Sequence, residues 1–237
     1  DFKDENMPKR QVETFVLSVG GSLIVTPEGV DVDFLAEFKA FIARQARKGR
    51  HFYLVVGGGA TARTYMRAAQ AVRSVPASER DWIGIRATRL NAQLLKAVLG
   101  RQAYPEILTN PETKIKSQHP FVVASGYKPG HSTDHDSVLL AKANGIRTVI
   151  NLSNIDYAYD KDPRHFPGAK QLEAVGWKEF RKIVGNRWQP GLNVPFDPVA
   201  SREAAEFGLR VAIMNGRNLP NLEAFLDGKK AKATVIS

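Results

Sequence analysis

Three turns rich in glycine and hydroxyl side chains are the parts of this sequence best suited to chemistry. They cover residues 20–22 (GGS), 57–59 (GGG) and 125–134 (SGYKPGHSTD), and each follows a short run of apolar, β-branched residues. Glycine has no Cβ, so backbone N–H groups in such a turn can point at a phosphate, and a following helix adds its positive N-terminal dipole. One such turn could be a simple tight connection, but three predict a shared cleft that binds phosphate groups.

The spacing of these residues excludes several common classes of site. Neither the dinucleotide fingerprint G-x-G-x-x-G nor the P-loop motif is present. A hydrolase triad could be written from His131, Ser132 and Asp134, but nearness in sequence is the wrong evidence for a triad, and no G-x-S-x-G elbow occurs. The five histidines show no metal-binding spacing, so we predict no metal-ligating side chains.

Three charged residues near the turns are candidates for binding or catalysis. Arg63 lies one turn into the helix expected after the GGG turn, where its guanidinium could bind phosphate oxygens or simply face solvent. Asp81 and Asp134 each stand where a helix is expected to begin, so either carboxylate could cap a helix instead of serving a ligand.

The elements that must position these residues alternate between short strands and longer helices, which is typical of a parallel sheet with helices on its faces. Strands are expected at 14–19, 51–56, 120–124, 148–152 and 210–213, with a weaker candidate at 103–108. Helices are expected at 32–47, 60–72, 83–99, 137–143, 199–207 and 221–226. The predicted fold class is α/β, with a mostly parallel open sheet sandwiched between helix layers.

Composition indicates a globular protein of the reducing cytoplasm. Hydrophobic residues make up 43% of the chain and charged residues 24%, and there is no cysteine, no membrane-spanning apolar run and no signal peptide. The net charge of +10 fits phosphate-bearing substrates, while no nucleic-acid-binding motif accompanies it. Residues 1–6 read as a non-native leader, and residues 7–237 as a single domain.

Six runs, in this order and spacing, resemble the uridylate kinases of the amino acid kinase family, especially its archaeal-type branch. They are VGGSLIV, VVGGGATARTY, DWIGIRATRLNAQLL, GYKPGHSTD, NLSNIDYAYDKDP and FDPVAS. The resemblance implies an amino acid kinase-like fold with an acceptor half (about 7–147) and an ATP half (about 148–237). It implies transfer of phosphate from ATP to UMP in pyrimidine nucleotide biosynthesis, Mg²⁺ bound with the ATP, and a homo-oligomer, commonly a hexamer.

The resemblance also assigns roles to individual residues. It places ATP at Gly21, Ser22, Gly59, Arg63, Ser153, Asn154, Tyr159 and Asp162. It places UMP at Gly58, Asp81, Tyr127, Lys128, Pro129, Gly130, His131, Ser132 and Thr133, of which residues 127–133 form the acceptor loop. It implies catalytic roles for Arg63, Lys128 and Asp134.

Departures from the family pattern leave two alternatives open. Ser18 stands where many members have a lysine that neutralises the moving phosphoryl group, so that charge must come from Arg63, Lys128 or Mg²⁺. Tyr127 and Lys128 replace a small hydroxyl residue and a histidine, and Tyr157 replaces a glycine. The alternatives are a family member that phosphorylates a different acceptor, and a non-catalytic protein that binds nucleotides or oxyanions.

Overall fold

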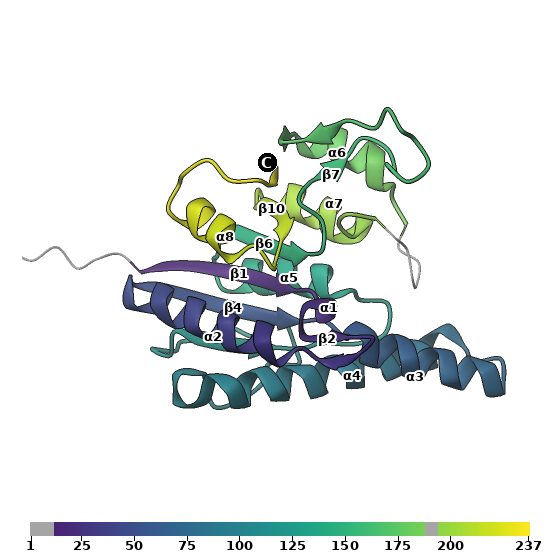
Figure 1. Ribbon diagram of the computed structural model, residues 1–237, viewed down its shortest axis with the longest axis horizontal. Helices are drawn as coiled ribbons and strands as arrows, with labels where there is room; N and C mark the ends of the chain where they lie inside the picture. Colours follow the sequence, from purple (N-terminus) through teal and green to yellow (C-terminus); the bar gives the residue numbers. More distant parts are fainter. Residues whose placement is uncertain (1–11, 188–193) are drawn as a thin grey trace, which may run out of the picture.

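A seven-stranded sheet organises the computed structural model, which describes residues 12–187 and 194–237 (Figure 1). In spatial order the strands are β5 (Phe121–Ala124), β4 (Arg50–Val56), β1 (Glu13–Val19), β6 (Thr148–Ser153), β10 (Arg210–Asn215), β11 (Thr234–Ile236) and β9 (Ala174–Val175). All neighbouring strands pair in parallel except β10 and β11. The mostly parallel sheet is confirmed.

Helices cover both faces of this sheet, because its central strands are apolar on both sides. On β1, Leu17 and Val19 face one core and Val16 faces the other. The first core is covered by α1 (Gly21–Ile24), α2 (Val32–Arg47), α3 (Gly59–Val72), α4 (Ala77–Leu99) and α8 (Leu219–Leu226). The second core is covered by α5 (Thr133–Ala143), α6 (Trp177–Val184) and α7 (Pro198–Glu206). The predicted sandwich is therefore confirmed.

Short elements complete the described chain. Two small hairpins form from β2 (Val25–Thr26) with β3 (Gly29–Val30) and from β7 (Ala158–Tyr159) with β8 (Gln171–Leu172), and a 3₁₀ turn, η1 (Gly100–Gln102), follows α4. The hairpins, β9, β11, α1 and α6 were not expected from the sequence. The leader at residues 1–6 lies outside the described residues, and the extent of the domain stays a prediction.

Three predicted elements differ from the structure. Helix α5 begins at Thr133 instead of 137, because the Ser132 hydroxyl oxygen accepts a hydrogen bond from the His135 N–H (3.2 Å) and caps a polar first turn. Helix α4 begins at Ala77 instead of 83, following Pro76. The candidate strand at 103–108 is wrong: only isolated bridges form at its two ends, since Pro105 lies between them without an N–H to donate.

Candidate functional site at the carboxyl edge of the sheet

The first two glycine turns lie in direct backbone contact at the carboxyl edge of the sheet. A Cβ on Gly21 would lie 2.1 Å from the backbone nitrogen of Gly59, and a Cβ on Gly59 would lie 2.3 Å from the oxygen of Gly21. Gly59 also has a φ of +60°, which L side chains rarely adopt. Only glycine permits this approach, and it leaves two helix N-termini side by side, an arrangement suited to phosphate groups.

Helix α4 holds the second glycine turn and the loop after β5 together. The buried Asn91 side chain donates hydrogen bonds to the carbonyl oxygens of Gly57 (2.9 Å) and Gly58 (3.1 Å). The hydroxyl of Thr88 accepts a hydrogen bond from the N–H of Gly126 (2.9 Å). Sequence reasoning missed Asn91 and Thr88, whose only signal is that they are polar residues within an otherwise buried helical face.

Asp81 does not cap a helix. It lies inside α4, whose N-cap position is Pro76, and one of its carboxylate oxygens accepts a hydrogen bond from the N–H of Gly130 (2.9 Å). The capping alternative for Asp81 is therefore wrong. The contact joins α4 to the acceptor loop, so the structure brings together two of the positions that the resemblance assigned to UMP.

Asp134 does not cap a helix either, since Ser132 does so for α5. Its carboxylate accepts hydrogen bonds from the Ser18 hydroxyl (3.2 Å), the Asn151 side chain (2.7 Å) and the backbone N–H of Asp197 (3.3 Å). Asp134 therefore ties β1, β6 and the start of α7 together. Neither Arg63 nor Lys128 is among these donors, and both side chains are exposed.

The environment of Asp134 disfavours its charged form. Burial, followed by the charge of nearby Asp197, raises the pKa of Asp134 to about 7, and the three hydrogen bonds only partly oppose this. A cation that arrives beside Asp134 would stabilise the charged form of this carboxylate. Ser18, the residue that departs most from the family pattern, supplies one of the hydrogen bonds and no charge.

Four of the predicted ATP residues line one pocket of about 590 Å³: Ser153, Asn154, Tyr159 and Asp162. Tyr157 lines it as well. The first glycine turn adjoins this region, because the N–H of Gly20 donates to the carbonyl oxygen of Leu152, just before Ser153 (2.9 Å). Hydrogen bonds from Arg164 lower the pKa of Asp162 to about 2, so this carboxylate is charged at neutral pH.

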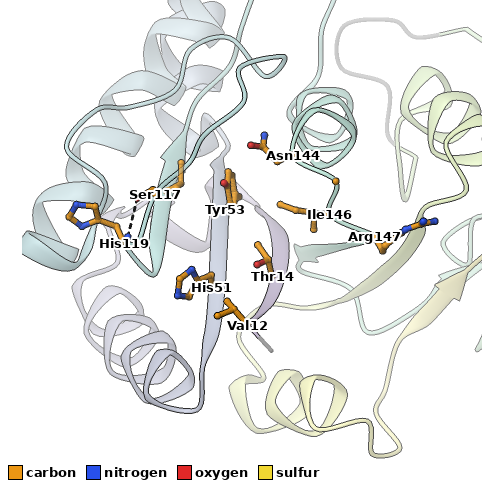
Figure 2. Close-up of a pocket in the computed structure, with 11 residues that line it drawn as sticks. Val12, Thr14, His51, Tyr53, Ser117, His119, Asn144, Ile146 and Arg147 are labelled. Carbon is orange, nitrogen blue, oxygen red and sulfur yellow. Dashed lines mark hydrogen bonds between the residues drawn. The ribbon is translucent and has the colours of Figure 1, made fainter. Parts of the chain in front are cut away.

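A second pocket of about 410 Å³ lies near the opposite ends of the parallel strands (Figure 2). It lies beside Thr14 and His51 near the starts of β1 and β4, and beside the turn that leads into β6. Figure 2 shows the His119 ring and the Arg147 guanidinium on opposite sides of this group, pointing away from each other. These two side chains do not converge on a ligand, so the pocket does not compete with the carboxyl edge as the site.

The described part of the chain has no cluster of side chains that could bind a metal ion by itself. Within residues 12–187 and 194–237, no three histidine or acidic side chains cluster into a metal site.

No described helix is long and apolar enough to cross a membrane.

The fold and this site define a nucleotide-binding α/β protein with its phosphate-binding turns at the carboxyl edge of an open sheet. Comparison with known proteins makes this class specific. The sequence profile of the Amino acid kinase family matches residues 13–215. The chain belongs to that family.

Individual relatives confirm the resemblance to the uridylate kinases. A uridylate kinase of Thermoplasma acidophilum is 33% identical over 226 residues, which cover 94% of this chain and 96% of that protein. One from Methanosarcina barkeri is 35% identical over 225 residues, covering 94% and 95%. The crystal structure of uridylate kinase from Archaeoglobus fulgidus has a TM-score of 0.78 and 28% identity, covering 94% of this chain and 99% of that one.

Proposed function

We propose that this protein transfers the γ-phosphoryl group of ATP to UMP, which yields ADP and UDP. The observation that carries the proposal is the contact between the two glycine turns, with the acceptor loop beyond one turn and the pocket of about 590 Å³ beyond the other. Two phosphate-bearing substrates that meet at such a junction can be held in line for transfer. The uridylate kinases among its relatives support UMP as the acceptor.

In this mechanism the chain mainly positions the substrates and stabilises charge. The paired helix N-termini at Gly21 and Gly59 bind phosphate oxygens, and the exposed guanidinium of Arg63 and ammonium of Lys128 can move onto the phosphoryl group. On the ATP side, the Tyr159 ring can stack on the base.

Mg²⁺ fits the site as a cofactor that arrives with ATP. The Asp134 carboxylate is the group that would hold it, because burial and the charge of nearby Asp197 raise its pKa and a bound cation would offset both effects. When bound, the ion would neutralise charge on the phosphate oxygens. These oxygens would supply most of its other ligands. No larger protein cage is required.

The surface of α3 and α4 supports the proposal of a homo-oligomer. Tyr65 and Val72 on α3 and Trp82 and Leu90 on α4 are all exposed, and the two helices pack side by side (Figure 1). Several large apolar side chains on one helix pair are typical of an interface. We extend the proposal to a hexamer that acts in the cytoplasm on small-molecule substrates, without nucleic acid or membrane.

A coupled assay of ADP release tests the activity. We expect kcat/KM for UMP to exceed that for CMP, AMP or GMP at least about tenfold, a difference of about 1.4 kcal/mol in transition-state binding. Carboxylate acceptors should give no turnover. A preference for CMP or for a non-nucleotide acceptor would contradict the proposal, and Tyr127 and Lys128 would then mark a different acceptor. Absence of turnover with every acceptor would favour a non-catalytic binding protein.

A further inference from the structure

A continuous series of side-chain contacts runs from the acceptor loop to His135 on α5, which faces α7 of the ATP half. The Lys128 ammonium lies 4.9 Å from the centroid of the Tyr127 ring, and that ring meets His131 edge-on at 5.5 Å between centroids. The His131 ring then stacks on His135, with centroids 4.3 Å apart and planes 23° apart. The two loop residues that depart from the family pattern, Tyr127 and Lys128, thus form the outer end of this stack.

Two carboxylates lie against the two histidines of the stack. Asp136, which is almost fully buried, accepts hydrogen bonds from Nδ1 of His131 (3.1 Å) and from the backbone N–H of Tyr127 (3.1 Å). On α7, an oxygen of Glu203 lies 3.1 Å from Nε2 of His135. Glu203 Oε2 and both ring nitrogens of His135 are buried and make no hydrogen bond within the described residues, so the 3.1 Å approach is a contact between two unsatisfied polar groups.

The role of Glu203 follows from the lack of other partners for its buried oxygen. Its side chain is only 19% exposed, and that of His135 only 9%. A buried carboxylate is costly unless a partner offsets the loss of water, and the His135 ring is the partner in reach. A carboxylate 3.1 Å from Nε2 restricts the orientations open to the His135 ring, and with them the face that this ring offers to His131.

We propose that Glu203, in the ATP half, is a positioning residue for the acceptor loop and acts through the stacked rings of His135 and His131. The inference rests on the proposed role of residues 127–133 in binding UMP. It makes acceptor binding depend on a side chain of α7, whose first turn is tied to Asp134 through Asp197. The two substrate halves are thereby linked through α7.

The test is the effect of Glu203→Gln on the two Michaelis constants. We expect KM for UMP to rise about tenfold while KM for ATP and the melting temperature stay nearly unchanged. Glu206→Gln is the matched control, because Glu206 lies on the same helix, is exposed and pairs only loosely with Arg202 (3.9 Å). This control should behave like the wild type.

A double-mutant cycle tests the route through His135. The variant His135→Phe keeps a ring for stacking but removes the nitrogen that faces Glu203, so adding Glu203→Gln to it should change KM for UMP by less than about twofold. Additive effects would overturn the route. A Glu203→Gln variant with wild-type KM for UMP, or with equal losses for UMP and ATP, would overturn the positioning role.

A third variant separates this inference from the proposed function. Tyr127→Ala removes the outer ring of the stack directly and should raise KM for UMP. If the wild type does not phosphorylate UMP, or if Tyr127→Ala leaves its KM unchanged, the acceptor assignment fails and the inference fails with it. If the wild type does phosphorylate UMP and Tyr127→Ala does raise KM for UMP, but Glu203→Gln leaves that KM unchanged, only the inference is overturned.

Discussion

At the scale of single residues, the Asp134 carboxylate joins the two halves of the site. Its partners Ser18, Asn151 and Asp197 come from three separate segments, and none of them carries a positive charge. Asp134 is therefore placed to meet positive charge that arrives with the substrates.

Asp134→Asn tests that role in catalysis. Asparagine has the same shape and keeps an oxygen that can accept from Ser18 and Asn151. Loss of the charge should lower kcat on the order of 10²–10³, as expected for one electrostatic contributor to a transition state. Steady-state rates measured beside thermal unfolding decide the point. Wild-type kcat would reject the catalytic role, and an equal loss of rate and stability would make Asp134 a structural residue.

The same variant has a predicted pH dependence of stability. Because folding raises the pKa of Asp134 from 3.8 to about 7, the folded state holds more protons than the unfolded state between these values. The contribution of Asp134 to the free energy of unfolding is therefore greatest below pH 4 and falls as the pH rises toward 7. The free energy of unfolding of Asp134→Asn minus that of the wild type, measured by urea unfolding, should therefore rise by about 1–3 kcal/mol from pH 5 to pH 8. A pH-independent difference would contradict the raised pKa.

At the scale of elements, the contact between the two glycine turns places α1 and α3 side by side. Gly59→Ala should lower the free energy of unfolding by about 2 kcal/mol or more, because it adds a clash with Gly21 to an unfavourable φ. Gly84→Ala in α4 is the control. Its Cβ would meet only the Met66 sulfur, at 3.9 Å, and alanine should stabilise the helix by about 0.5–1 kcal/mol. Chemical unfolding measures both, and equal stability of the two variants would refute the close contact.

At the scale of the whole molecule, the exposed apolar side chains on α3 and α4 predict association of several copies. Leu90→Asp should shift the protein to smaller species in analytical ultracentrifugation, because a charge would be buried in the interface. Val32→Asp, at an equally exposed apolar residue on α2, should leave the assembly intact. A wild type that is monomeric at micromolar concentration would contradict the proposal.

Several features of the protein follow from the sequence by itself. Buried parallel strands are short apolar runs, and the turns that follow them must contain glycine where backbones approach closely, so β1, β4, β5 and β6 and their turns were predictable. The motifs after those strands also identified the family. Local pattern and spacing carry this information because each signal lies within a few consecutive residues.

The tertiary structure decided which distant side chains meet. Asp81 and Asp134 look like helix caps in the sequence, yet they bond Gly130 and Ser18 across the fold. Glu203 reads as an ordinary helical residue until α7 packs beside α5 and places it against His135. Hydrogen bonds and close polar contacts of this kind join residues far apart in the chain, so no local pattern records them, and only the packing of the layers determines which pairs form.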